Sequence, residues 1–129
     1  MGADVFSVTS FTELRRDGMD AERHNRLHPG EEPRRSWVEQ QLDDRPTVAS
    51  TDYMRTYADQ IRPYVPGRYE VLGTDGFGRS DWRRVLRSFF EVDRHHVVVA
   101  ALDALGDERV ARAIERYGID ADAEAPWRR

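Results

Sequence analysis

The chain has 129 residues, of which 39% are apolar and 34% charged, and it contains neither cysteine nor lysine. This length suits one domain with its own core, while the missing residue types exclude disulfides, thiolate or Schiff-base chemistry and sulfur-ligated metals. The net charge is −4, with 20 arginines dispersed among 24 acidic residues, so we expect no nucleic-acid partner. No apolar run is long enough to span a membrane and no signal sequence opens the chain, which predicts a cytoplasmic protein without a membrane segment.

The first third of the chain is predicted to be a strand, a helix and a loop. Polar and apolar residues alternate over 3–8, which indicates a short strand. A helix begins at Ser10, which has the capping-box spacing with Glu13. Its apolar positions are sparse and Gly18 interrupts them, so we expect a weak helix that can break. Residues 29–46 are rich in proline and charge, and we expect a loop outside the core with one helical turn around 37–42.

Two more strands and a helix are predicted in the middle of the chain. A β-prone run at 47–51 leads into a helical pattern over 53–61. Residues 69–72 are again extended, and a glycine-rich turn follows over 73–78.

An amphipathic helix is predicted after this turn. Either Ser80 or Asp81 has the side chain of an N-cap. The apolar residues at helical spacing are Trp82, Val85, Leu86 and Phe89. We therefore expect these four side chains to form one face.

The last predicted elements are two further helices. Asp93 opens the first, and its apolar stripe continues to Leu105, which favours a helix over a strand at 97–99. The second runs over 110–117 and ends at Gly118.

Strands alternating with helices predict an α/β domain over residues 1–120, followed by a flexible tail over 121–129. The sheet should be parallel or mixed, with helices on both faces. Three short strands are few for this architecture, so we expect a neighbouring chain or a second copy to cover the sheet edge.

The four histidines are the first candidates for chemistry. His24 and His28 are four residues apart on a predicted helix and could bridge a metal, but no third ligand is evident, and a solvated or capping pair is favoured. His95 and His96 point about 100° apart on a helix and cannot act together, so one is expected to cover the helix start. No Gly-x-Ser-x-Gly elbow exposes a serine nucleophile. We assign no catalytic or metal-binding residue.

The turn over 73–81 is the stronger candidate for a functional surface. It follows a strand and opens a helix, as phosphate-binding loops do, but it lacks the Gly-x-Gly-x-x-Gly spacing. We interpret Gly76 and Gly78 as positions where a Cβ would be hindered, and Asp75 and Ser80 as caps of backbone donors. Functional surfaces of α/β domains lie at this end of the strands.

Four segments of the sequence resemble a known family. They read VTSFTELRRDGMDAERHNRLHP, ASTDYMRTYADQIRPYVP, YVPGRYEVLGTDGFGRSD and LRSFFEVDRHHVVVAAL. They resemble the C-terminal domain of the homodimeric, bacterial-type pyruvate dehydrogenase decarboxylating component, a thiamine-diphosphate-dependent member of the transketolase-like superfamily. The resemblance extends from about Gly2 to Asp120, and its TDGFGRSD string is specific.

The resemblance implies a three-layer, transketolase C-terminal-domain-like fold with a sheet flanked by helices, lacking the usual first strand-helix unit. In this family two other domains hold thiamine diphosphate through magnesium and activate its aminopyrimidine. It therefore implies no cofactor-binding residue in this chain, and thiamine diphosphate with magnesium in a partner chain. The loop implied to face neighbouring domains as an interface or cleft consists of Asp75, Gly76, Phe77, Gly78, Arg79 and Ser80.

The chain departs from the family in three places. His24 stands where the family usually has Trp, Trp82 where a small polar residue is usual, and the stretch between Leu105 and Val110 is shorter. These departures favour a shifted substrate or an altered partner surface.

Two functions follow from the resemblance as expectations. In the first, the chain is the C-terminal subunit or domain of a split pyruvate dehydrogenase-like or transketolase-like enzyme, inactive alone, which docks on a chain carrying the two cofactor domains. The assembly would transfer a two-carbon unit, from pyruvate or a ketose phosphate, to a lipoyl or carrier-protein thiol. In the second, it is a non-catalytic docking module that recruits an acyltransferase or a lipoyl or acyl-carrier domain.

Overall fold

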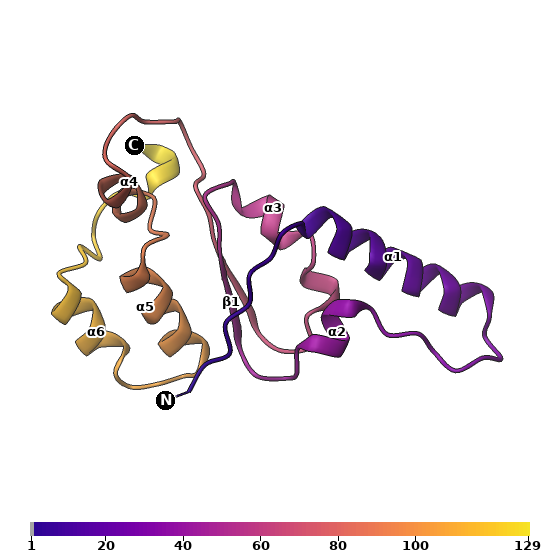
Figure 1. Ribbon diagram of the computed structural model, residues 1–129. Helices are drawn as coiled ribbons and strands as arrows, with labels where there is room; N and C mark the ends of the chain where they lie inside the picture. The colour runs from indigo at the N-terminus through magenta and orange to yellow at the C-terminus, as the bar shows by residue number, and fades with distance from the viewer. Residues whose placement is uncertain (1) are drawn as a thin grey trace.

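A computed structural model describes residues 2–129 as a small parallel sheet between two groups of helices (Figure 1). Strands β1 (Thr47–Ser50) and β2 (Tyr69–Leu72) pair in parallel, with Thr47 opposite Tyr69 and Ser50 opposite Leu72. The helices are α1 (Phe11–Leu27), α2 (Trp37–Gln41), α3 (Arg55–Asp59), α4 (Arg83–Phe89), α5 (Arg94–Ala104) and α6 (Val110–Tyr117), with 3-10 turns at Arg62–Tyr64 and Pro126–Arg128. The predicted α/β class and the parallel pairing are confirmed.

Helix α1 is continuous through Gly18, so the expected break is absent. The Ser10 hydroxyl accepts a hydrogen bond from the Glu13 backbone N–H at 3.2 Å, whereas the Glu13 carboxylate pairs with Arg16. Only half of the predicted capping box therefore forms. A Cβ at Gly18 would lie 2.4 Å from the Tyr64 ring, so the missing side chain lets that ring pack directly against the helix.

The main core lies between one face of the sheet and helices α1 to α3. Its buried members are Phe11, Val38, Ala58, Ile61, Tyr64, Val65, Tyr69 and Val71. The prediction that residues 29–46 lie outside the core is wrong at Val38 and at the fully buried Ser36. The Ser36 hydroxyl accepts from the Glu39 N–H at 3.2 Å, and the Glu39 carboxylate accepts from the Ser36 N–H at 2.7 Å. This complete capping box holds a short helix against the core.

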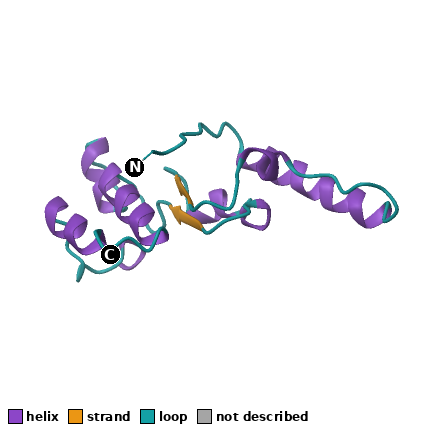
Figure 2. Cartoon of the chain, turned by 90° about the horizontal axis from the view of Figure 1, so that it is seen from below, coloured by secondary structure: helices purple, strands orange, loops and turns teal. Residues whose placement is uncertain are grey.

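Helix α5 covers the opposite face of the sheet, and α6 packs on α5 (Figures 1 and 2). Asp93 caps α5 as predicted, and its carboxylate accepts from the N–H groups of His95 and His96, both at 3.0 Å. Residues 97–99 are helical, and Gly118 ends α6 in the left-handed region with φ of 63°. These three sequence predictions are confirmed.

The predicted strand over 3–8 does not form, so the sheet has two strands within residues 2–129 rather than three. The segment is an exposed loop that Figure 2 shows separate from both strands, and an ion pair of 2.9 Å between Asp4 and Arg45 ties it to the domain. An alternating pattern becomes a strand only where a neighbouring strand offers free backbone groups, and here none is paired with it.

The end of the chain is a short turn against the rest of the domain. Pro126 is buried. The flexibility predicted for residues 121–129 stays a prediction, because the burial of one residue does not measure motion. Among residues 2–129 there is no helix with the length and apolar character needed to cross a membrane.

Candidate functional site

The loop between β2 and α4 is fixed at its base by the loop that follows β1. Because the strands are parallel, both loops leave the sheet at the same edge. The Thr74 N–H donates to the Tyr53 carbonyl at 2.9 Å, and the Thr74 hydroxyl donates to the Asp52 carbonyl at 2.6 Å. Asp52 in turn forms an ion pair of 3.0 Å with Arg87 of α4. The two loops therefore hold α4 to the sheet edge.

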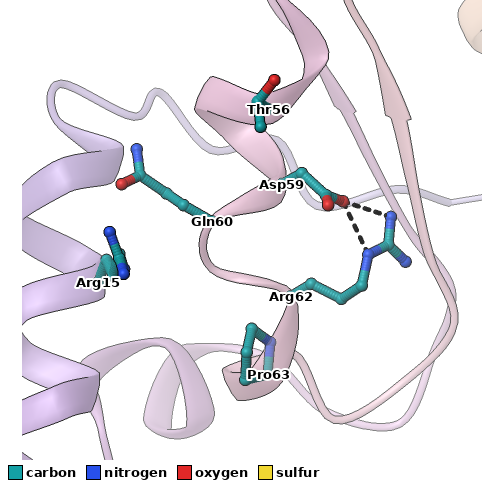
Figure 3. Close-up of a pocket in the computed structure, with 6 residues that line it drawn as sticks. All are labelled: Arg15, Thr56, Asp59, Gln60, Arg62 and Pro63. Atoms are coloured by element: carbon teal, nitrogen blue, oxygen red, sulfur yellow. Dashed lines mark hydrogen bonds and ion pairs between the residues drawn. The ribbon is translucent and has the colours of Figure 1, made fainter.

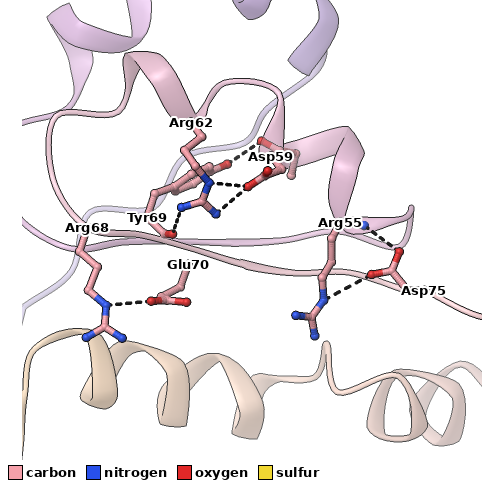
Figure 4. A network of polar contacts seen from close by, with 8 residues as sticks. Arg55, Asp59, Arg62, Arg68, Tyr69, Glu70 and Asp75 are labelled. Atoms are coloured by element: carbon pink, nitrogen blue, oxygen red, sulfur yellow. Dashed lines mark hydrogen bonds and ion pairs between the residues drawn. The ribbon is translucent and has the colours of Figure 1, made fainter. Parts of the chain in front are cut away.

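Asp75 caps a backbone donor, as the sequence predicts. Its carboxylate accepts from the Arg55 N–H at 3.3 Å and lies 3.4 Å from the Arg55 Nε (Figure 4). That Nε is buried and has no hydrogen-bond partner within residues 2–129, so the Asp75 charge compensates it. The Arg55 guanidinium also lies 5.0 Å from the centre of the Trp127 ring. The Asp75 carboxylate thus ties the loop to the start of α3.

The glycines of this loop have unequal roles. A Cβ at Gly73 would lie 2.6 Å from the Arg55 backbone nitrogen, and Gly76 has a φ of 107° with the Trp127 Cα 3.0 Å from its absent Cβ. Gly78 has neither restriction, since nothing lies within 4 Å of its Cβ position. We call residues 73–76 the neck of the loop and residues 77–80 its tip. The prediction for Gly76 is confirmed and that for Gly78 is wrong, because the close contacts lie at the neck.

The tip of the loop faces solvent. Phe77 is 84% exposed and Trp82 83%. The predicted caps Ser80 and Asp81 do not begin α4. Trp82 is its N-cap, without a side-chain hydrogen bond, and the Asp81 carboxylate accepts from the Trp82 N–H at 2.7 Å. Of the four residues expected on the apolar face of α4, Trp82 and Val85 are exposed and Leu86 and Phe89 are partly buried.

Arg79 is the tip residue that makes a defined side-chain contact. Its guanidinium lies 4.1 Å from the centre of the Phe89 ring, and the Arg129 guanidinium lies 4.8 Å from the same ring. Arg129 also lies 3.6 Å from Glu91. The structure thus brings Arg79 to α4 and Asp75 to α3, whereas Phe77 and Ser80 remain exposed at the tip.

A depression that sequence reasoning missed lies between α1 and α3. It has a volume of about 470 Å³ and is lined by Arg15, Thr56, Asp59, Gln60, Arg62 and Pro63 (Figure 3). Arg62 is already engaged, by an ion pair of 2.6 Å with Asp59 and a hydrogen bond of 2.7 Å to the Tyr69 carbonyl (Figure 4). No local motif joins residues from two separate helices, so the sequence carries no signal for this surface.

Buried Tyr69 lies behind this depression. Burial raises the pKa of Tyr69 to about 12, and its hydroxyl donates to the Ala58 carbonyl at 2.9 Å. The Tyr69 side chain therefore serves the core as a neutral hydrogen-bond donor.

The histidines make structural contacts. The His24 and His28 rings stack with centres 4.2 Å apart, and the His28 Nδ1 is 2.9 Å from the His24 carbonyl. The His96 Nδ1 returns to the Asp93 carboxylate at 2.8 Å, which confirms that one of the adjacent pair covers the helix start, while the His95 ring stacks on Tyr117. Within residues 2–129 no three His, Cys, Asp or Glu side chains are grouped to hold a metal ion.

Comparison with known proteins identifies the family. Residues 1–93, which contain the sheet, the loop and α4, match the family described as the Transketolase-like TK C-terminal domain. The chain belongs to this family. It is 60% identical to the "Pyruvate dehydrogenase E1 component" of Pseudomonas aeruginosa and 57% identical to that of Escherichia coli K12, over 98% of this chain in both cases. The Buchnera aphidicola protein from Acyrthosiphon pisum is 50% identical over 95% of the chain.

These relatives are much longer than the chain. It spans about 15% of the length of each. The resemblance seen in the sequence is confirmed at the level of the transketolase C-terminal-like domain and of similarity to pyruvate dehydrogenase E1 components.

Proposed function

We propose that this chain is the C-terminal subunit or domain of a pyruvate dehydrogenase E1-like, thiamine-diphosphate-dependent enzyme, and that it works only when docked on a chain carrying two cofactor domains. The observation that carries the proposal is the similarity to E1 components over nearly the whole chain but only about 15% of their length. The assembly acts in the cytoplasm, where it decarboxylates pyruvate and transfers the two-carbon unit to a lipoyl or carrier-protein thiol.

The cofactor belongs to the partner chain in this proposal. The residues of the loop do not fit a magnesium diphosphate site: the Asp75 carboxylate occupies the Arg55 N–H at the loop neck, and no group of three metal-ligating side chains occurs in residues 2–129. The chemical steps of the proposed reaction therefore take place on the partner chain.

The role proposed for the chain is to support the cleft of the assembled enzyme. The neck of the loop is fixed to α3 and to the β1 loop by Thr74 and Asp75, while its tip at Phe77 is exposed. A rigid neck with an exposed tip suits a loop that meets another protein surface, because the loop loses little conformational entropy when it docks.

The alternative is a non-catalytic docking module that recruits an acyltransferase or an acyl-carrier domain. The exposed aromatic tip supports this function equally, since aromatic side chains and arginines are enriched at protein interfaces. The donor substrate separates the two functions, because a docking module processes neither pyruvate nor a ketose phosphate.

Complementation tests the proposal. The E1 component of Pseudomonas aeruginosa, truncated to remove the part that matches this chain, is mixed with this chain, thiamine diphosphate and magnesium. We expect carbon dioxide release from pyruvate only when both chains are present, and no heat of cofactor binding to this chain alone by calorimetry. An active truncated enzyme that this chain does not stimulate supports the docking module, and stoichiometric cofactor binding to this chain alone overturns both.

A further inference from the structure

Helix α4 has no fully buried residue, although Leu86 and Phe89 of its apolar face are partly buried. Trp82 is 83% exposed and Val85 49%, and Phe77 in the preceding loop and Trp127 near the end of the chain are exposed as well. An apolar face of this kind stays in water only at a cost, and contiguous exposed apolar surface marks interaction sites. We call this surface, made of residues 77–89 and 127–129, the α4 surface.

The α4 surface is strongly basic in an acidic chain. Its charged residues are Arg79, Arg83, Arg84, Arg87, Arg128 and Arg129 against Asp81 alone. Arg87 is neutralised by Asp52 and Arg129 lies near Glu91. Arg83, Arg84 and Arg128 are exposed and form no ion pair with another residue of the part described, 2–129. Since the whole chain has a net charge of −4, the remaining surface is correspondingly more acidic.

A shallow hollow lies within this basic rim. It has a volume of about 260 Å³ and is lined by Arg79, Ser80, Asp81, Val85, Leu86 and Phe89. The floor consists of apolar side chains of α4, and the Phe89 ring is held from one side by Arg79. The hollow has the size and lining for one or two aliphatic side chains, with guanidinium groups next to them.

We infer that the α4 surface binds an acidic segment of a partner protein, with an apolar side chain in the hollow and carboxylates on Arg83 and Arg84. Arginine binds carboxylates with two parallel hydrogen bonds, and the aromatic side chains supply the buried area. The inference deepens the proposed function and rests on it for the view that the 75–80 loop meets a partner. It adds the chemistry of that partner and places the contact on α4.

The observations favour a short acidic protein segment over an extended polyanionic surface such as a nucleic acid or an anionic membrane. A long polyanion would also meet the acidic remainder of the chain, which repels it. A short acidic segment that covers only the α4 surface avoids this repulsion. The hollow takes an aliphatic side chain, a group that a phosphate backbone does not have.

Fluorescence anisotropy with a synthetic probe tests the inference on this chain. The probe is a labelled peptide with Leu and Glu at helical spacing, and the comparison peptides carry Gln for Glu or Ser for Leu. We expect the Leu/Glu peptide to bind at least about tenfold more tightly than either comparison peptide, with an affinity that falls as salt is raised. The emission of Trp82 should shift to shorter wavelength on binding, and Trp82→Phe should remove that shift.

Charge reversal supplies the matched control. Arg83→Glu with Arg84→Glu should weaken peptide binding about tenfold or more. Arg15→Glu with Arg16→Glu makes the same change of net charge on α1 and should leave binding unchanged, with circular dichroism showing that both variants are folded. Equal binding of the Gln peptide, equal loss in both double variants, or tighter binding of a single-stranded oligonucleotide or of phosphatidylserine vesicles would overturn the inference.

This outcome is separable from that of the proposed function. Peptide binding that persists while complementation fails counts against the E1-like assembly only. Complementation that survives Arg83→Glu with Arg84→Glu, together with absent peptide binding, counts against the acidic partner only.

Discussion

Two regions of the chain, the core around α1 to α3 and the surface around α4, bury their apolar side chains to different extents. On the side of α1 to α3, side chains from three helices and both strands bury one another, and Ile61 is only 5% exposed. Around α4, no residue of the helix is fully buried: Leu86 and Phe89 are partly buried and Val85 is 49% exposed. An amphipathic pattern states that one face of a helix is apolar, but it does not state whether the same chain covers that face.

The largest expected effect is the difference in unfolding free energy between two truncations, one in each region. Ile61→Ala should lower the free energy of unfolding by about 3 kcal/mol, because it leaves a cavity between α1, α3 and the sheet. Val85→Ala should change it by no more than about 0.5 kcal/mol, because the side chain is half exposed. Urea unfolding measures both. Similar losses in the two variants would mean that α4 is packed in solution.

This contrast explains which parts of the fold the sequence predicts. The elements at 47–50, 69–72 and 94–104 depend on local signals, namely β-branched runs, an Asp N-cap and a continuous stripe, and all three are confirmed. The cap of α6 at Gly118 needs only a residue that tolerates positive φ. Local chemistry therefore suffices for elements whose ends and faces are served by adjacent residues.

Two of the failures depend on neighbours that are distant in the sequence, and one depends on a local capping box that sequence reasoning missed. Gly18 is tolerated within α1 because Tyr64, far along the chain, occupies the space beside it. Val38 is buried because a capping box at Ser36 turns a polar segment back onto the core. Residues 3–8 alternate as a strand does but have no strand to pair with. In the candidate site, local reasoning identified Asp75 and Gly76 but not the contacts of the loop with Arg55 and Trp127.

The second expected effect separates the neck of the 73–81 loop from its tip. Gly73→Ala should cost about 2 kcal/mol of unfolding free energy, because the new Cβ would lie 2.6 Å from the Arg55 backbone nitrogen, and backbone cannot move aside as a side chain does. Gly78→Ala should be neutral within about 0.5 kcal/mol, since its Cβ position is open. Thermal and urea unfolding of the two single variants check this, and equal stability would show that the neck is as free as the tip.

A third, smaller effect concerns Tyr69 in the core behind α3. Tyr69→Phe should cost about 1 kcal/mol, because the Ala58 carbonyl loses a buried hydrogen bond. Burial raises the pKa of Tyr69 to about 12 from 10.0, so the neutral phenol is favoured in the folded state. Its stabilising contribution is complete below about pH 10 and is lost as the pH rises toward 12.

Spectrophotometric titration of tyrosinate follows this group directly. The wild-type chain should show one tyrosine that titrates near pH 12, and Tyr69→Phe should remove that step while the other tyrosines are unchanged. Exposed Tyr53→Phe is the matched control and should leave the step in place. Loss of the step in Tyr53→Phe would show that the titration near pH 12 does not belong to Tyr69.

The smallest effect distinguishes charge from hydrogen bonding at the start of α5. Burial acts to raise the pKa of Asp93, but hydrogen bonds from the backbone and side chain of His96 and from the His95 N–H outweigh it and leave the pKa below its ordinary value of 3.8. The ionised form is thus favoured in the folded state, so the stabilising contribution of Asp93 is present above about pH 4 and is lost as the pH falls through the lowered pKa.

Asp93→Asn keeps an N-cap acceptor but has no charge to lose, so it should cost less than about 1 kcal/mol at neutral pH. It should also flatten the acid limb of the stability curve, which is the fall in unfolding free energy at low pH. Unfolding in urea at neutral and acidic pH measures this, with Asp122→Asn in the last segment as a variant of equal charge change that should retain the wild-type acid limb. An unchanged acid limb in Asp93→Asn would mean that Asp93 stabilises α5 through its hydrogen bonds alone and that its charge contributes nothing.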